Sequence, residues 1–292
     1  MSLLNNKHLN RWRLKSVSRN ESRRIPYRHS NHPNLLSRID TLQMITESDV
    51  SISRFGDGEL MMALLERGIS FQEKNRELSN RLKQILIEKD SRILVCMNNE
   101  FMRYEQIAWV LQYERSAKEY HRFESWKEPK DIGILSRKNE CAFYNECYRI
   151  LFGNKKPSVF GDATLFMIGL YTEEYKKEQM ERVFELFVKL FKKKRLLIAA
   201  SRTPLMAPSF RELGPKLLAA GASGISHIDI PEKDAFNYYD KIKSKILNSS
   251  NIDAVWIQAG PAATVMVHDL TVNHSILSYD IGSFNTTLKY VL

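Results

Sequence analysis

Short apolar runs alternate along the chain with longer segments in which apolar residues recur every three or four positions. The first pattern predicts buried strands and the second predicts amphipathic helices. Strands are expected at residues 92–97, 158–160, 196–200, 224–230, 254–258 and 276–281, and at residues 51–55, where apolar and polar residues alternate. Helices are expected at residues 34–47, 59–67, 76–89, 101–118, 139–151, 173–193, 208–220, 233–247 and 261–272.

Strands that alternate with helices favour parallel pairing through right-handed crossovers. The rhythm is clearest after residue 195, where four strands are separated by three helices. We therefore predict the α/β class: a doubly wound, mostly parallel, Rossmann-like sheet with helices on both faces. We expect a single domain at residues 31–292, with an irregular insertion around residues 120–165.

Residues 1–30 differ from the rest because they show little hydrophobic periodicity and carry eight Lys or Arg side chains against one acid, Glu21. The whole chain has a net charge of +10, so most of the excess lies in this segment. We predict a flexible basic tail. Such a tail could bind an anionic membrane surface, bind nucleic acid, or only be solvated, and the sequence leaves these alternatives open.

Composition and motifs argue against a zinc-binding, membrane-spanning or nucleic-acid-binding protein. The three cysteines form neither a CxxC pair nor a zinc-ligand spacing, which favours reduced thiols in a cytosolic protein. The apolar runs are shorter than the roughly 20 residues that a membrane span needs. No RRM, KH or helix-turn-helix pattern accompanies the tail, which disfavours a nucleic-acid partner. We expect a cytoplasmic protein whose tail offers a peripheral contact with the inner face of the membrane.

Two strand ends carry candidate chemistry, and the first contains an acid flanked by glycines. Gly56 and Gly58 surround Asp57 at a predicted strand-to-helix turn, with Glu59 two residues beyond Asp57. In an extended turn these two carboxylates could bind one hard cation, Mg²⁺ or Mn²⁺. Alternatively, Asp57 only stabilises the turn and Glu59 complements the helix N-terminus. Arg54 either assists ligand binding or braces the turn.

The second strand end contains Gly260, Pro261 and Thr264. Gly260 permits a tight turn, and Pro261 suits the first position of a helix. Free amide groups in that first turn would form an anion site for a diphosphate, to which Thr264 could add a hydroxyl. A simple helix cap would give the same pattern. No GxGxxG or Walker loop is present, so no motif supports a dinucleotide or ATP site.

Single acids near other strand ends are weaker candidates. Asp162, Asp229 and Asp280 could each act as a general base or bind a sugar hydroxyl, and Asp162 is our candidate for the base. Arg137 and Arg202 could bind phosphate through two parallel hydrogen bonds. Solvated loop residues would look the same in the sequence, so the alternative for each is a structural role.

Several of these segments coincide, in order, with one family. Residues 53–59 resemble the RFGDGE signature of bacterial glycosyltransferases of the GT-D fold, long known only as a domain of unknown function. Residues 231–236, 260–265 and 280–282 are similar to its Pro-x-x-Asn-Ala-Phe, Gly-Pro-Thr-Ala and Asp-Ile-Gly segments. The resemblance covers about residues 50–285.

The resemblance implies a glycosyltransferase that moves a hexose, typically glucose, from a UDP-sugar to a surface glycan or glycosylated surface protein. In the family, the acid-x-acid motif binds the metal and the UDP diphosphate, and here that role falls on Asp57 and Glu59. Asp234 stands where the family usually has an Asn near the nucleotide. The alternatives are a non-catalytic nucleotide-sugar-binding protein and a nucleic-acid-binding protein.

Overall fold

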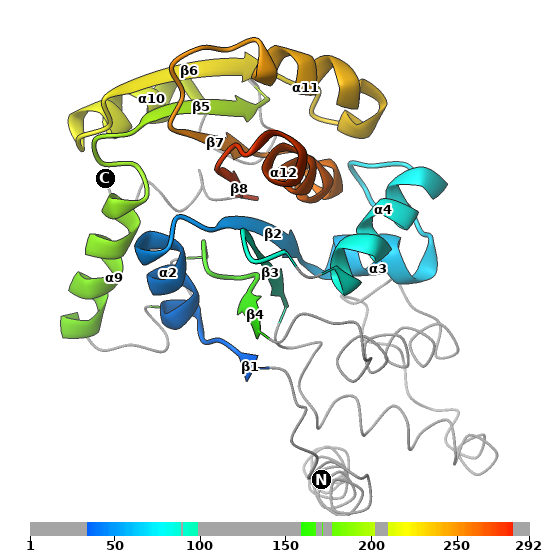
Figure 1. Cartoon of the computed structure of the whole chain (residues 1–292), viewed down its shortest axis with the longest axis horizontal. Coiled ribbons are helices and arrows are strands. Elements are labelled where there is room, and N and C mark those ends of the chain that lie inside the picture. The colour runs from blue at the N-terminus through cyan, green and yellow to red at the C-terminus, as the bar shows by residue number, and fades with distance from the viewer. Residues whose placement is uncertain are drawn as a thin grey trace, which may run out of the picture. The chain divides into compact units, whose positions relative to one another are not determined.

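In the computed structural model, eight parallel strands form one sheet, in the order β1-β4-β3-β2-β8-β7-β5-β6 (Figure 1). The strands are β1 (Asn34–Leu35), β2 (Ser51–Phe55), β3 (Ile93–Met97), β4 (Val159–Asp162), β5 (Arg195–Ala200), β6 (Gly224–Asp229), β7 (Ala254–Ile257) and β8 (Ser278–Asp280). The structure describes residues 34–88, 90–98, 159–167, 171, 177–201 and 210–282. The predicted tail at 1–30 and the predicted insertion up to residue 158 lie outside these ranges.

Helices cover both faces of the sheet, as predicted. One face carries α2 (Arg38–Glu47), α9 (Lys177–Lys189) and α10 (Phe210–Ala219). The other carries α3 (Asp57–Leu65), α4 (Arg76–Ile87), the 3₁₀ helix η1 (Ala235–Tyr238), α11 (Tyr239–Leu247) and α12 (Pro261–His274). In Figure 1 these two layers lie on opposite sides of the strands. The doubly wound α/β architecture is therefore confirmed.

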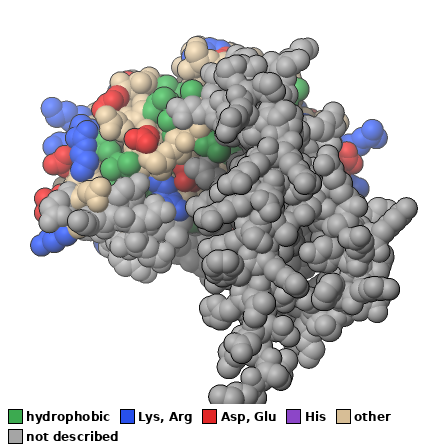
Figure 2. Space-filling model, turned by 90° about the horizontal axis from the view of Figure 1, so that it is seen from below, with side chains coloured by type: hydrophobic (Ala, Val, Ile, Leu, Met, Phe, Trp, Pro, Cys, Tyr) green, Lys and Arg blue, Asp and Glu red, His purple; other side chains and the backbone are tan. Residues whose placement is uncertain are grey.

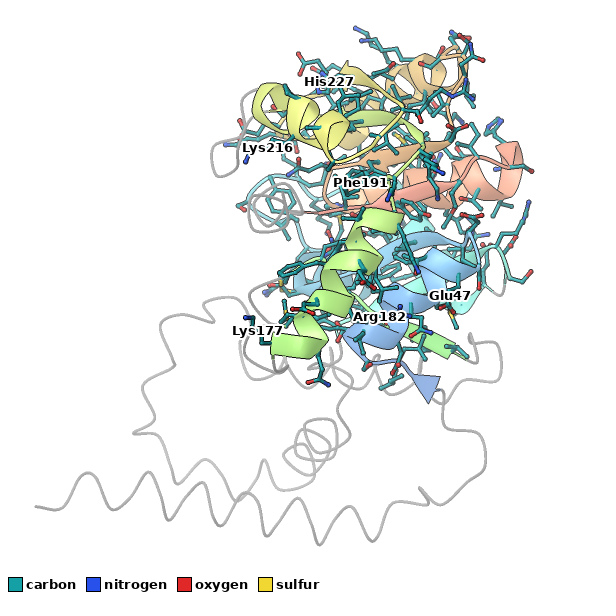
Figure 3. The ribbon with its side chains drawn as sticks, turned by 90° about the vertical axis from the view of Figure 1, so that its left-hand side faces the viewer. Glu47, Lys177, Arg182, Phe191, Lys216 and His227 are labelled. Atoms are coloured by element: carbon teal, nitrogen blue, oxygen red, sulfur yellow. The ribbon has the colours of Figure 1, made fainter. Side chains whose placement is uncertain are left out.

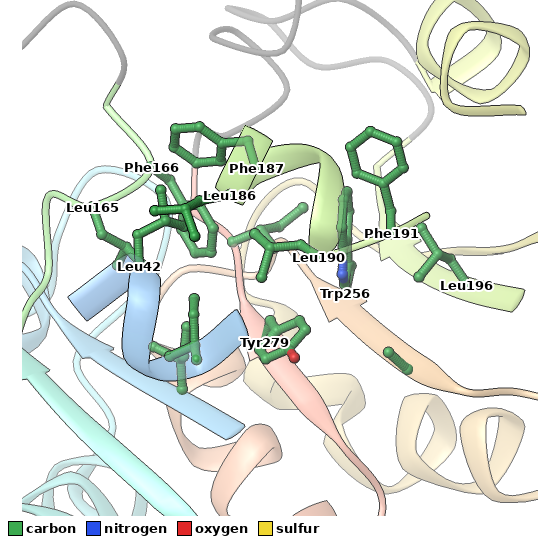
Figure 4. Close-up of a cluster of buried hydrophobic side chains, with 14 of the residues drawn as sticks. Leu42, Leu165, Phe166, Leu186, Phe187, Leu190, Phe191, Leu196, Trp256 and Tyr279 are labelled. Carbon is green, nitrogen blue, oxygen red and sulfur yellow. The ribbon is translucent and has the colours of Figure 1, made fainter. Parts of the chain in front are cut away.

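The core beneath α2 and α9 is continuous and rich in aromatic side chains (Figure 4). The amphipathic helix α9 buries Phe187, and just beyond its end the Phe191 ring meets Trp256 of β7 edge-on at a centroid distance of 6.2 Å. Figure 3 looks onto this helical layer, where the labelled Lys177 and Arg182 mark α9. Because both faces are covered, β3, β7 and all but the first residue of β5 are unbroken apolar runs, which is why the sequence located these strands well.

Three predicted helices begin differently within the described residues, and one of them is α3, which starts at Asp57 instead of residue 59. The helix predicted from residue 34 starts at Arg38, where Ser37 caps it by accepting a hydrogen bond from the Asp40 amide. Residues 34 and 35 instead form β1, which pairs with β4. The helix predicted from residue 233 does not include Asp234, whose left-handed conformation, with φ of 54°, an α-helix cannot contain. The residues after Asp234 form η1, and α11 follows it.

Among the described residues, none of the helices has both the length and the apolar character that crossing a bilayer would require.

Candidate functional site

All strands run parallel, so their carboxyl ends lie at one edge of the sheet, where open α/β sheets bind ligands. The predicted acidic turn follows β2, Asp280 ends β8, and Gly260 follows β7. These three strands are consecutive neighbours in the sheet. The fold therefore brings the two predicted motifs to the same part of the edge. Asp229 ends the outermost strand, β6, and lies apart from them.

Asp57 and Glu59 do not sit in the extended turn that the sequence suggested. Asp57 is the first residue of α3, and Gly56 is the residue that precedes the helix. The Glu59 carboxylate turns back and accepts a hydrogen bond from the Gly56 amide at 3.1 Å. Asp57 is exposed. Residues two apart on a helix do not face the same way, so the two carboxylates start from different sides of α3.

The Glu59 carboxylate is electrostatically unfavourable where it lies. Burial, followed by the negative charge of Asp280, raises the pKa of Glu59 to about 7, although Arg54 acts in the opposite direction. Burial likewise raises the pKa of Asp280, which is 3% exposed, despite opposing contributions from Arg54 and from hydrogen bonds. Two acids with raised pKa values at a strand edge are typical of functional sites.

Arg54 supplies the positive charge between these acids. Its Nε donates to the Ala163 carbonyl at 2.7 Å, and its guanidinium lies 5.6 Å from the centroid of the Phe166 ring. Its Nη1 is buried and has no hydrogen-bond partner among the described residues. A side chain on Gly282 would overlap the guanidinium, so glycine is required there by contact as well as by its φ of 49°. An unpaired buried N–H is the kind of group that an anionic ligand would satisfy.

The side chain of Thr264 is fully buried rather than presented to a ligand. Its hydroxyl oxygen lies 2.9 Å from both the Arg54 carbonyl and Asp280 Oδ2. A hydroxyl has one proton, which it can donate to either of these two acceptors. The phosphate contact predicted for this hydroxyl finds no support. Thr264 instead fixes Asp280 beneath the site.

The N-terminus of α12 keeps the features of an anion site. Gly260 precedes the helix with φ of 54° and ψ of −139°, a conformation that glycine adopts readily, and Pro261 occupies the first turn. Neither a side-chain cap nor an acidic residue occupies this turn. By contrast, α3 has two acids in its first turn. The positive end of the α12 dipole is therefore not neutralised by a side chain of its own turn, although Pro261 and the three residues that follow it are buried.

Asp234 holds a loop instead of pointing to an open site. Its Oδ1 accepts hydrogen bonds from the Glu73 amide at 2.6 Å and from Gln72 Nε2 at 3.4 Å. Its own amide donates to the Phe71 carbonyl at 2.9 Å. Asp234 thus shapes residues 71–73, and the nucleotide contact implied by the family resemblance stays a prediction.

Gly58 is also explained by packing. A Cβ on this residue would lie 3.1 Å from Ile69 Cδ1, so the glycine makes room for the loop that follows α3. At Gly56, by contrast, the nearest atom to such a Cβ would be Glu59 Oε2 at 3.0 Å. Gly56 thus leaves space for the returning carboxylate.

Asp162 lies at the end of β4, two strands away from β2. Its Oδ1 accepts hydrogen bonds from the Thr164 amide and hydroxyl, at 2.8 and 2.6 Å. Its Oδ2 faces Arg38 Nε at 3.9 Å. Because both oxygens face protein groups, the structure favours a role for Asp162 in fixing the turn over our candidate role as general base. Arg137 and Arg202 lie outside the described residues.

The carboxylates at this edge suit the predicted cation. Asp57 offers an exposed carboxylate, and Glu59 has a second oxygen beside the one that bonds Gly56. Carboxylate oxygens suit Mg²⁺ and Mn²⁺, which are commonly held by one or two carboxylates together with substrate phosphates. Within the part of the chain that is described, no group of three or more His, Cys, Asp or Glu side chains could hold a metal alone. Because the two carboxylates start from different sides of α3, a cation here would need further ligands, such as the oxygens of a diphosphate.

Two residues gain importance from the structure beyond what the sequence assigned to them. Asp280 appeared there as one of three acids near strand ends, and its buried contacts with Thr264 and Gly282 distinguish it. Phe71 received no role, yet 43% of its surface is exposed and its ring lies against Gly260. The available signal was an aromatic residue in the short loop after the acidic motif.

Comparison with known proteins gives a consistent picture. A family model described as glycosyltransferase GT-D fold matches residues 52–289. A Streptococcus gordonii protein named probable glycosyl transferase Gly is 26% identical over 257 residues, 88% of this chain and 33% of that protein. Glycosyltransferase GlyD of Streptococcus pneumoniae serotype 4 is 25% identical, over 86% of this chain and 27% of that protein. The chain thus spans a third or less of the length of these relatives.

Solved structures share the fold. One, described as a new glycosyltransferase (DUF1792) from Streptococcus sanguinis, superposes with a TM-score of 0.62 at 24% identity, covering 88% of this chain and 84% of that one. Another, described as a domain of unknown function 1792 with a distinct glycosyltransferase fold, gives a TM-score of 0.62 at 23% identity, covering 95% and 84%.

Proposed function

Since the chain belongs to the glycosyltransferase GT-D fold family, we propose that it transfers a hexose, such as glucose, from a UDP-sugar to an acceptor. The acceptor would be a glycan or a glycosylated surface protein. One observation carries the proposal: the acids that follow β2 and the uncapped N-terminus of α12 lie at the same sheet edge, on either side of Asp280.

In this proposal, Asp57 and Glu59 hold Mn²⁺ or Mg²⁺ together with the donor diphosphate. The cation would neutralise negative charge on the departing nucleoside diphosphate. The first turn of α12, preceded by Gly260 and begun by Pro261, would bind the same diphosphate through backbone amides and the helix dipole. Two groups of this chain therefore recognise the part of the donor that all UDP-sugars share.

Arg54 and Asp280 would set the charge balance of the buried part of this site. The buried Arg54 Nη1 lacks a hydrogen-bond partner among the described residues, and a phosphate oxygen would supply one. Asp280 places a second negative charge near Arg54 and Glu59, so the single positive charge of Arg54 faces two carboxylates. Binding of a cation and an anion together would balance the cluster.

The test is release of nucleoside diphosphate from a panel of donors, with Mn²⁺ or Mg²⁺, by the wild type and by Asp57→Asn. We expect the wild type to hydrolyse or transfer at least one UDP-sugar slowly, and Asp57→Asn to lose about 100-fold or more in rate. EDTA should abolish the same release. Equal rates in the two proteins would remove Asp57 from the proposal.

A matched control is available on another helix. Asp240 is also an exposed acid in the first turn of a helix, α11, and it lies outside the proposed site. Asp240→Asn should therefore release the diphosphate at the wild-type rate. If both substitutions lower the rate equally, the effect reflects general electrostatics of helix termini.

Two alternative functions would give different results. A protein that binds UDP without any transfer or hydrolysis would be a binding module. A nucleic-acid-binding protein would instead show steep salt dependence carried by residues 1–30. Among the described residues visible in Figure 2, basic and acidic side chains lie beside one another. Trimming residues 1–28 should leave donor hydrolysis unchanged and weaken only binding to anionic membranes or polyanions.

A further inference from the structure

The loop between α3 and α4 lies across the first turns of two helices that border the proposed site. Ile69 of this loop packs against Gly58 in α3, where a Cβ would lie 3.1 Å from its Cδ1. Phe71 packs against Gly260, where a Cβ would lie 2.5 Å from its Cε2. A Cβ on Gly260 would overlap the Phe71 ring, and a Cβ on Gly58 would press on the Ile69 side chain. The loop therefore forms a wall of the site, reaching from α3 to α12.

The backbone of this loop is fixed by the segment that follows β6. Asp234 donates its amide to the Phe71 carbonyl and accepts the Glu73 amide. Gln72, which is 2% exposed, accepts the Phe236 amide at 3.2 Å through its Oε1. Residues 69 and 72 also exchange backbone hydrogen bonds, at 2.8 and 3.2 Å. Phe71 is thus held at the tip of a tight and well-bonded turn.

The Phe71 side chain is nevertheless 43% exposed. The ring packs against Gly260 but exposes apolar surface to solvent beside the N-terminus of α12. In the proposed function, that helix end binds the diphosphate of the donor. In a nucleoside diphosphate the base is joined to the diphosphate through the ribose, so a flat apolar surface next to a diphosphate site suits the base.

We propose that Phe71 is the stacking platform for the base of the nucleotide donor, and that Asp234 and Gln72 are positioning residues that hold it. This inference rests on the proposed function. It also assigns a role to Asp234, which would act on the nucleotide through Phe71 instead of by direct contact. Its left-handed conformation, with φ of 54°, explains why Asp is suited to the position, since Asn and Asp tolerate this region best after glycine.

The experiment is calorimetric titration of the full chain, in Mn²⁺, with two probes: UDP and inorganic pyrophosphate. Phe71→Leu keeps an apolar side chain of similar volume but removes the aromatic face. We expect it to weaken UDP binding roughly 5- to 50-fold, because base stacking on an aromatic side chain contributes in this range. Pyrophosphate has no base, so its affinity should stay within about twofold. Phe71→Trp should retain UDP binding.

Asp234 supplies a matched pair. Asp234→Asn keeps an acceptor oxygen and tolerance of the left-handed conformation, so it should bind UDP like the wild type. Asp234→Leu has neither property and should weaken UDP while sparing pyrophosphate. Circular dichroism of each variant confirms that the fold is kept.

The possible outcomes separate the inference from its premise. If UDP and pyrophosphate weaken together in Phe71→Leu, the ring has only a structural role and the inference is wrong. If neither weakens, the base binds elsewhere and the inference is again wrong. A wild type that binds neither probe would contradict the proposed function itself, and with it the basis for assigning Phe71.

Discussion

Two clusters of partly or fully buried charge, both in contact with α12, are built on opposite principles. In the first, Asp269 accepts hydrogen bonds from the Tyr239 hydroxyl at 2.7 Å, Lys243 Nζ at 3.0 Å and Asn273 Nδ2 at 2.7 Å. Burial disfavours its charge, but the hydrogen bonds from Asn273, Tyr239 and Lys243 outweigh burial and lower the pKa of Asp269 to about 2. This carboxylate is fully compensated.

In the second cluster, Glu59 and Asp280 lie near Arg54, and their pKa values are raised instead. One Glu59 oxygen accepts one backbone hydrogen bond, and Arg54 Nη1 has no partner among the described residues. Leaving buried charges incompletely paired costs stability. The difference indicates that the Asp269 cluster stabilises the fold, whereas the Glu59 cluster is arranged for a ligand that completes it.

The largest functional difference between the two clusters should appear when one acid is removed from each. Glu59→Gln keeps a side-chain oxygen that can accept the Gly56 amide but removes the charge. We expect it to slow donor hydrolysis by about 100-fold, because the cation and diphosphate lose a ligand. Asp269→Asn should leave the rate within about twofold. Initial rates of UDP release measure both, and equal losses would show that the clusters do not differ in function.

The geometry around Arg54 gives a second test. Gly282→Ala places a methyl group against the guanidinium and forces a non-glycine residue to a φ of 49°. We expect unfolding free energy to fall by about 2 kcal/mol from strain, and UDP affinity to fall because Arg54 is displaced. Chemical denaturation and calorimetry measure the two effects. Gly221→Ala, also at positive φ but far from Arg54, should cost stability without changing UDP affinity.

The negative charge of Asp269 should contribute to the free energy of unfolding. Asp269→Asn is expected to lower the unfolding free energy by about 1.5 kcal/mol at pH 7, since charge-assisted hydrogen bonds from Lys243 and Tyr239 are weakened. The pKa of Asp269 is depressed, so its contribution is present above the ordinary Asp range and is lost as pH falls toward about 2. Urea melts at pH 7 and at about pH 2.5 should show the difference shrinking in acid.

The second cluster should have the opposite pH dependence. Because the folded pKa of Glu59 is raised to about 7, the folded state holds this proton more tightly, and stability falls as pH rises from about 4.5 through 7. Glu59→Gln removes this loss, so its stability relative to the wild type should be about 1 kcal/mol greater at pH 8 than at pH 5, without metal. Melts in EDTA measure it. A pH-independent difference between the proteins would contradict the raised pKa.

Much of the fold was predictable because buried parallel strands leave a local signal. The apolar runs at β3, β5 and β7 and the apolar/polar alternation at β2 match the strands to within about one residue, and the alternating helices fix the architecture. β1 was missed because its two residues become a strand only by pairing with β4, more than a hundred residues later. Local propensity does not contain such a partner.

The site was predictable in place but not in detail. The sequence located the acids that follow β2 and the glycine before α12, since both are marked by residue types at strand ends. It did not reveal that Asp57 begins a helix, that Thr264 bonds Asp280, or that Asp234 bonds the loop at Phe71. These contacts join side chains to groups far away in the chain, and the sequence alone does not say which side chains are already bonded.

The most direct measurement is a crystal structure of the full chain with UDP and Mn²⁺, in which anomalous scattering locates the metal. We predict a manganese peak on the carboxylates of Asp57 and Glu59, with the UDP diphosphate between it and the first turn of α12. A nucleotide bound elsewhere, with those two side chains turned away from it, would contradict the proposed function.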